Sequence, residues 1–188
     1  RIVTVQLATF LLGQRGALDP APDQIEIALE PDLVDPGISG DHDLLDFRTG
    51  GVRLLADHLA LYFKTKNFHW HVKGPRFRDL HLLFDEQAIE LRDQIDAIGE
   101  RVRKLGEVTL TSIGSVARAT QVKDQDSTDL DGDAMVKELH DDNVAMIKRL
   151  KGMKPLAEEA GDNATDGLLD DWTDMAEERA WFLKSTLG

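Results

Sequence analysis

The sequence predicts an all-α protein built as a four-helix bundle. Two observations support this fold class. Four segments after residue 46 carry apolar residues at helical spacing, and each is long enough to form one helix of a bundle. The second and third segments are separated by residues 106–129, a connection too long for an antiparallel hairpin and long enough to cross the bundle.

The first two helices are expected over residues 44–71 and 77–105. Gly74 and Pro75 mark the turn between them, and Gly106 is a usual helix stop. The apolar face of the first helix is formed by Leu54, Leu55, Leu59, Tyr62 and Phe63.

The second half of the bundle follows the crossover, which is expected to carry a short helix near residues 112–120. The third helix is expected over residues 131–161, and Pro155 should break or bend it near its end because proline lacks the backbone N–H. The fourth helix is expected over residues 164–187. Its expected buried residues are Leu168, Leu169, Trp172, Met175, Trp181 and Phe182.

Residues 1–46 are expected to form an irregular N-terminal extension, separate from the bundle of residues 47–188. Four prolines interrupt any helix there, while residues 24–30 alternate apolar with polar or small side chains, as a half-buried strand does. We hypothesise an ordered arm that docks on the bundle or on a neighbouring subunit. A flexible tail is the alternative, and rapid proteolysis of the segment would favour it.

The composition is typical of a soluble, cytoplasmic protein. The absence of cysteine excludes disulfides and thiolate metal sites. No apolar run approaches the roughly 20 residues needed to span a bilayer. Residues 2–12 resemble the core of a signal peptide, but Thr4, Gln6 and Thr9 interrupt them and no cleavage site is clear.

The chain is strongly acidic, with a formal net charge of −13. Nonspecific DNA binding needs clustered Lys or Arg side chains that release counterions from the phosphates. Residues 19–46 hold many carboxylates and no Lys or Arg, so DNA binding through a basic tail is not expected. Solubility or adaptation to salt accounts for most of such an acid excess, and a protein that stores cations would also use some of it to attract them.

Two pairs of potential metal ligands have helical i, i+4 spacing, His81/Asp85 and Asp96/Glu100. Residues four apart lie nearly over one another on a helix, as the ligands of one metal ion must. The two pairs share a stripe but lie roughly 16 Å apart along the helix, so one chain cannot close a site with both. A second copy, antiparallel across a two-fold axis, would bring them together.

His69, on the preceding helix, completes the expected donor set because the turn at Gly74 lets its ring approach His81. Two imidazoles and three carboxylates suit iron(II), manganese or zinc, and the sequence does not choose among these three. Each pair alone has a simpler explanation: Asp96/Glu100 as a solvated helix face, and His81/Asp85 as a structural hydrogen bond. His58 is read as a structural residue.

Beyond these pairs, the chain resembles the Dps family of mini-ferritins from about residue 47 to residue 188. The motif is long and specific. It comprises Asn67-Phe68-His69-Trp70-His71-Val72-Lys73-Gly74, Phe77, Leu80-His81, Phe84-Asp85-Glu86, Asp96 and Gly99-Glu100-Arg101.

This resemblance implies a ferritin-like bundle assembled as a hollow dodecamer, with two-fold dimers as its units. Such a protein oxidises iron(II), typically with hydrogen peroxide, and stores a ferric mineral inside. The family's ferroxidase ligands fall on His69, His81 and Asp85 of one subunit and on Asp96 and Glu100 of its partner. Zinc or manganese is expected to substitute for iron at these ligands.

The resemblance also implies roles for Trp70, Asp162 and Asp166. Trp70, beside the metal site, is expected to intercept oxidising equivalents, although core packing is the more common role of a tryptophan. Asp162 and Asp166 match the region of an acidic three-fold pore, and helix capping explains them equally well. A stripe of Glu86, Glu90 and Asp93 is expected either to face the cavity or to form surface ion pairs.

Other classes of protein remain as alternatives. A ferritin with its di-iron centre inside one bundle uses Glu-x-x-His pairs, and no Glu lies three residues before any of the six histidines. A DNA-protecting nucleoid protein with little oxidase activity would shift DNA on a gel at low salt. A purely structural helical assembly would bind no iron.

Overall fold

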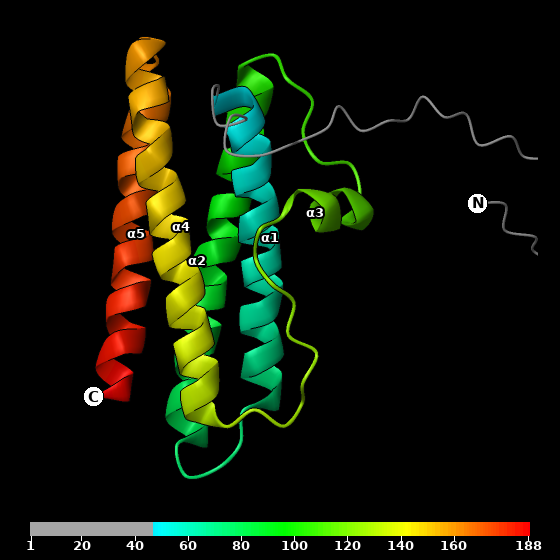
Figure 1. Ribbon diagram of the computed structural model, residues 1–188, viewed down its shortest axis with the longest axis vertical. Helices are drawn as coiled ribbons and strands as arrows, with labels where there is room; N and C mark the ends of the chain where they lie inside the picture. Colours follow the sequence, from blue (N-terminus) through cyan, green and yellow to red (C-terminus); the bar gives the residue numbers. More distant parts are fainter. Residues whose placement is uncertain (1–46) are drawn as a thin grey trace, which may run out of the picture. The chain divides into compact units, whose positions relative to one another are not determined.

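The structure, a computed structural model, describes residues 47–188. Four long helices pack side by side, and a short fifth helix lies in the connection between the second and third of them (Figure 1). The helices are α1 (Phe47–His71), α2 (Phe77–Lys104), α3 (Ile113–Ala119), α4 (Gly132–Glu159) and α5 (Asn163–Leu187). The predicted all-α bundle with a long crossover is confirmed; the strand and docked arm predicted before residue 47 lie outside the described residues.

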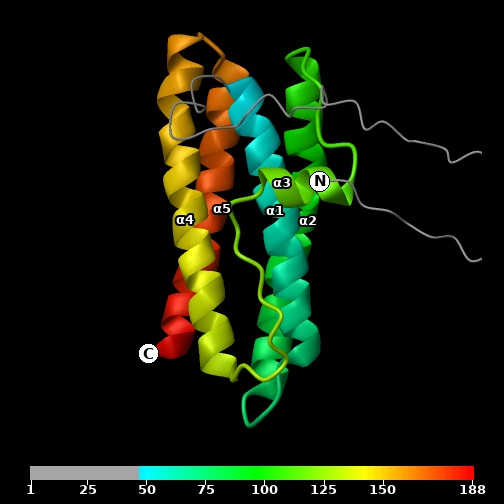
Figure 2. The ribbon, with the colours of Figure 1, turned by 45° about the vertical axis from the view of Figure 1, so that its right-hand side comes forward.

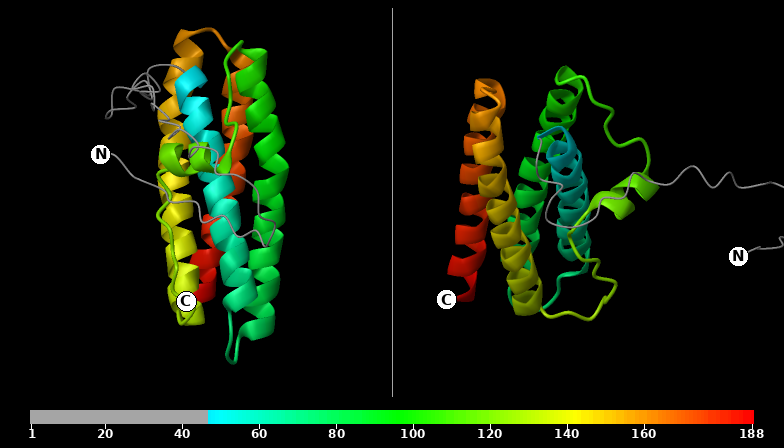
Figure 3. Two further views of the ribbon diagram at one scale, coloured as in Figure 1. Left: turned by 90° about the vertical axis from the view of Figure 1, so that its right-hand side faces the viewer. Right: turned by 45° about the horizontal axis from the view of Figure 1, so that its top comes forward.

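Two antiparallel pairs make up the bundle, α1 with α2 and α4 with α5. The crossover leaves the end of α2, forms α3 beside α1, and then runs to the start of α4 at the opposite end of the bundle (Figures 2 and 3). As a result α2 and α4 run in the same direction. No helix of the described part of the chain is long and apolar enough to cross a membrane.

Glycines end two of the long helices. Gly106 has a φ of 92° and Gly161 a φ of 65°, a backbone region that residues with a Cβ adopt only at a cost. After α2, the Glu107 N–H donates to the Val102 carbonyl and the Gly106 N–H to the Arg103 carbonyl. The same pair of bonds follows α4, so both helices end in a Schellman motif.

Pro155 does not break α4, which continues to Glu159. The predicted break is wrong because proline removes only one backbone hydrogen bond here, and the turn containing it is held by packing; the alternative of a bend stays a prediction. Met153 and Ala157, on either side of Pro155, are each only 1% exposed. Burial of apolar surface around the proline compensates for the missing hydrogen bond.

The apolar core runs along the facing sides of all four long helices, and it includes Leu54, Phe68, Phe84, Leu139 and Leu169. Three side chains that were predicted to face the core are instead exposed in the single chain: Phe63, Trp181 and Phe182. A helical repeat identifies apolar positions but does not separate a stripe that faces the core from one that faces away from it.

The crossover is fastened to the bundle by buried polar contacts. The Asp57 carboxylate, fully buried on α1, accepts hydrogen bonds from the Thr120 hydroxyl at 2.8 Å and the Gln121 N–H at 2.6 Å. Its second oxygen lies 2.9 Å from Nε of Arg149 on α4. One carboxylate therefore links α1, the crossover and α4.

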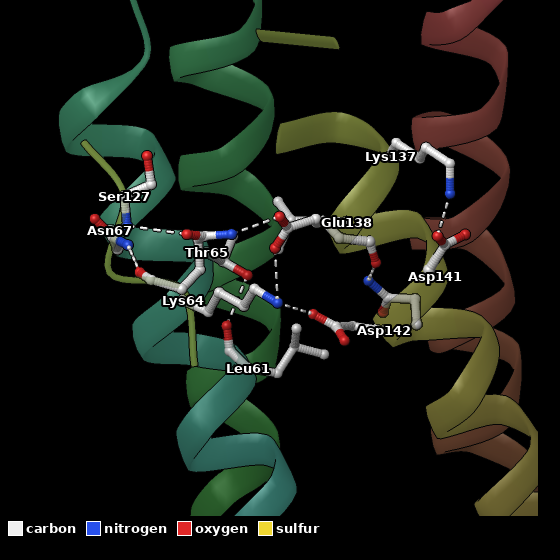
Figure 4. Close-up of polar contacts among 12 residues, drawn as sticks. Leu61, Lys64, Thr65, Asn67, Ser127, Lys137, Glu138, Asp141 and Asp142 are labelled. Carbon is white, nitrogen blue, oxygen red and sulfur yellow. Dashed lines mark hydrogen bonds and ion pairs between the residues drawn. The ribbon is translucent and has the colours of Figure 1, made fainter. Parts of the chain in front are cut away.

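A second group of contacts, nearer the C-terminal end of α1, is drawn in Figure 4. The Asn67 amide donates to the Gln125 carbonyl at 3.0 Å, and Gln125 in turn donates to Glu138 at 2.7 Å. Lys64 of α1 reaches Glu138 at 3.1 Å and Asp142 at 2.7 Å on α4. These contacts fix the end of α1, which carries the first of the predicted metal ligands.

Candidate metal centre

The turn between α1 and α2 brings His69 and His81 into direct contact. Their rings stack with centroids 3.8 Å apart and planes 20° from parallel. The two residues also bond reciprocally, because Nδ1 of His69 lies 2.8 Å from the His81 carbonyl and Nδ1 of His81 lies 2.8 Å from the His69 carbonyl. Each Nδ1 therefore carries its proton toward a carbonyl, which leaves each Nε2 with a free lone pair in the neutral ring.

Phe77, at the start of α2, covers the other face of His81. Its ring stacks on the imidazole with centroids 5.0 Å apart and planes 30° from parallel. His81 is thus held between Phe77 and His69, and both histidine rings have a fixed orientation. This arrangement is the one that metal-binding imidazoles commonly show, with the non-ligating nitrogen bonded to a carbonyl.

Asp85 lies one helical turn after His81, and its Oδ1 is 3.9 Å from Nε2 of His69. The same oxygen accepts a hydrogen bond of 2.6 Å from the Lys66 ammonium. That hydrogen bond lowers the pKa of Asp85 below its usual value. An ionised carboxylate therefore lies beside the two imidazoles, and we call His69, His81 and Asp85 the half-site.

Asp96 and Glu100 lie further along α2 and are exposed. Glu100 pairs with Lys104 at 2.9 Å, and both side chains are largely in solvent. Across residues 47–188, His, Asp and Glu side chains do not gather in groups of three or more that could hold a metal ion. Within the described residues, one chain therefore does not bring together a complete set of metal ligands.

Large apolar side chains are exposed on α1 and α2, the two helices that carry the half-site. Phe63 and Trp70 meet edge to face at 6.1 Å, and Trp70 is 57% exposed, so it is not a core residue of the single chain. The exposed apolar side chains of these two helices are Phe63, Trp70, Phe77, Leu82 and Ile89. Exposed large apolar side chains are a common feature of protein interfaces.

The two predicted pore residues have structural partners in this chain. Asp162 accepts a hydrogen bond from the Thr165 N–H at 3.1 Å, which caps α5, and it pairs with Arg101. Burial raises the pKa of Asp162, but the bonds from Thr165 and Arg101 outweigh this and bring it to about 2. Asp166 accepts from Lys154 at 2.8 Å. The capping role of Asp162 is therefore established, and a pore role remains a prediction.

A buried arginine, Arg179, lies between the helices of the bundle. Arg179, 1% exposed, donates to the Asn143 side chain at 2.9 Å, and its Nη1 lies 3.5 Å from Glu90. Glu90, predicted to belong to a stripe with Glu86 and Asp93, therefore forms an ion pair with a buried arginine. Sequence reasoning missed Arg179 and Asn143, because a single polar residue within an amphipathic pattern gives no periodic signal.

His58 is structural, as predicted. Its side chain is fully buried, and its Nδ1 lies 2.8 Å from the Leu54 carbonyl. Burial, together with the charge of Arg179, lowers the pKa of His58 to about 4, so the ring is neutral at pH 7. His58 is therefore a core residue of the bundle, and it lies on α1 about three turns before His69.

Comparison with known proteins places residues 52–188 in the family model of the ferritin-like domain. The DNA protection during starvation protein of Helicobacter pylori is 31% identical over 72% of this chain and 94% of its own. The Dps structure from Thermosynechococcus elongatus has a TM-score of 0.73 and 30% identity over 77% of this chain and 90% of its own.

The Dps protein from Vibrio cholerae O1 is described as a member of a broad superfamily of ferritin-like diiron-carboxylate proteins. Its structure has a TM-score of 0.72 and 27% identity, and the match covers 76% of this chain and 89% of that one. Both the sequence and the fold of the described bundle are thus similar to those of Dps proteins.

Proposed function

This chain belongs to the Dps family of ferritin-like proteins, and from that premise we propose that it takes up iron(II), oxidises it at sites shared between two copies, and stores the ferric product. The observation that carries this proposal is the interlocked pair of His69 and His81. Their Nδ1 atoms are occupied by carbonyls, so both Nε2 atoms are available beside an ionised Asp85.

The ligand set is completed by Asp96 and Glu100 of a second copy. Both side chains are exposed in the single chain, and they lie on the same helix as His81 and Asp85. Two copies of α2 packed antiparallel across a two-fold axis set each carboxylate pair opposite the other copy's half-site, which yields two identical sites. The exposed apolar side chains on α1 and α2 supply the surface that such packing would bury.

The donor set supports oxidation chemistry. Imidazole and carboxylate ligands suit iron(II), and they also accept zinc or manganese. The three carboxylates favour the more highly charged iron(III) product, because the interaction of each with the ion grows with its charge. With hydrogen peroxide as the oxidant, two iron(II) ions each lose one electron, and one peroxide takes up both electrons and two protons to become two waters.

Trp70 has a supporting role in this proposal. Its ring is 57% exposed and one residue from His69, which places an oxidisable side chain at the edge of the half-site. It would intercept stray oxidising equivalents before they reach the rest of the chain. The ferric product would be held within a hollow homo-oligomer, for which we propose the twelve subunits of the family's usual assembly.

The test is an anaerobic titration with iron(II) followed by a pulse of peroxide, with particle size measured on the same samples. We expect saturable binding and fast oxidation in the wild type, and the loss of both in Asp96→Ala/Glu100→Ala with the particle intact. Asp141→Ala is a matched control, since it removes an exposed carboxylate of α4 that, like Glu100, pairs with a lysine four residues away. Equal oxidation rates in the wild type and the double variant would show that the α2 stripe is structural.

A further inference from the structure

Lys66 is a charged residue at the half-site that the proposed ligand set does not use. It lies on α1 three residues before His69, and its side chain is only 18% exposed. Its ammonium is 2.6 Å from Oδ1 of Asp85, the same oxygen that lies 3.9 Å from Nε2 of His69. A fixed positive charge is therefore in contact with a carboxylate that the proposed function assigns to iron.

The position of this ammonium is set by its surroundings. It lies 5.9 Å from the centre of the Trp70 ring, one turn further along α1, which attracts the cation to the ring face. The Asp85 carboxylate is 39% exposed, so solvent alone would leave its side chain free to rotate. The hydrogen bond from Lys66 fixes it beside the histidine pair.

We propose that Lys66 is a positioning residue that acts as a resident counter-ion of the half-site. It holds the Asp85 carboxylate toward His69 and gives this carboxylate up when a divalent cation binds. This inference rests on the proposed function, because it takes Asp85 as a ligand. The ammonium and an incoming dication repel each other, so Lys66 lowers the affinity of the site as well as ordering it.

The proposal predicts the direction of change when the charge is removed. A unit positive charge within a few ångströms of a carboxylate typically weakens its binding of a proton by about tenfold to a thousandfold, and we apply the same scale to a metal cation. Since Lys66 is partly exposed and can move into solvent, the lower end of that range applies. Removing the ammonium should therefore tighten the binding of a divalent metal by about tenfold.

The experiment measures the binding of Co²⁺ to the full oligomer by titration calorimetry and by the visible absorbance of the bound ion. Co²⁺ is used because it takes the same ligand types as iron(II) and is not oxidised during the titration. The variants are Lys66→Met and Lys66→Gln, which remove the charge, and Lys66→Arg, which keeps it. Lys73→Met is the matched control, since Lys73 pairs with Asp129 on the open surface at 3.4 Å.

We expect Lys66→Met and Lys66→Gln to bind Co²⁺ about tenfold more tightly than the wild type, and Lys66→Arg and Lys73→Met to match the wild type. Unchanged or weaker binding in both charge-removing variants, with the oligomer intact, would overturn the role of Lys66 as a counter-ion that competes with the metal. Asp85→Ala separates the two proposals. If it leaves Co²⁺ binding unchanged in the wild-type and Lys66→Met backgrounds, the half-site itself is wrong.

Discussion

Acidification should destabilise this bundle through His58. The ring is fully buried, and burial, with the charge of Arg179, lowers its pKa from 6.5 to about 4. In the unfolded chain the ring takes up a proton near pH 6.5, whereas in the folded chain it stays neutral down to about pH 4. Between these values the unfolded state binds more protons, so stability falls as the pH falls.

The magnitude follows from the same two pKa values. Each unit of difference corresponds to about 1.4 kcal/mol, so the loss on going from pH 7.5 to pH 4 is about 3 kcal/mol per chain. Above pH 6.5 the contribution is fully present. The perturbation that isolates it is His58→Gln, which is neutral at every pH and can still donate a hydrogen bond to the Leu54 carbonyl.

The assay is urea unfolding of the wild type and His58→Gln at several pH values, with protein concentration fixed because the assembly contributes to stability. All other titrating groups are shared, so the difference between the two pH profiles reports His58 alone. We expect the wild type to lose about 3 kcal/mol more than the variant between pH 7.5 and pH 4. Parallel profiles would refute the assignment of a buried, neutral histidine.

Two further predictions concern the fold. Asp57→Ala removes the carboxylate that binds Thr120, Gln121 and Arg149, so it should lower the free energy of unfolding by about 3 to 5 kcal/mol. Limited proteolysis should then cut the crossover faster than in the wild type. Equal resistance to proteolysis would contradict the role of Asp57 in holding the crossover against the bundle. Gly106→Ala places a Cβ at a φ of 92° and should lower stability by about 1 to 2 kcal/mol in the same urea assay, whereas an unchanged midpoint would show that the end of α2 adjusts freely.

The helices were predictable because their signals are local. Gly106 and the long connection after it were sufficient to predict the end of α2 and a crossover, and both follow from backbone geometry that a single residue type or a chain length imposes. The exposure of Phe63 and Trp181 was not predictable from the sequence. A helix that contacts both its own core and another copy has two apolar stripes, and the sequence does not label them.

The half-site was predictable in part. The spacing of His81 and Asp85, and the turn after His69, indicated which side chains would meet. The reciprocal bonds of the two rings to backbone carbonyls, the stacking of Phe77 and the contact of Lys66 with Asp85 depend on rotamers and on the exact angle between α1 and α2. These details decide which nitrogen is free, and they require the structure.

The central claim is that each site takes ligands from two copies, and mixing two inactive variants tests it most directly. One variant carries His81→Ala/Asp85→Ala and the other Asp96→Ala/Glu100→Ala. In a mixed dimer one site has lost all four ligands and the other keeps its full set. With random pairing, half of the dimers are mixed, so about a quarter of the wild-type iron oxidation should return. A verified mixed oligomer with no more activity than either parent would contradict the shared site.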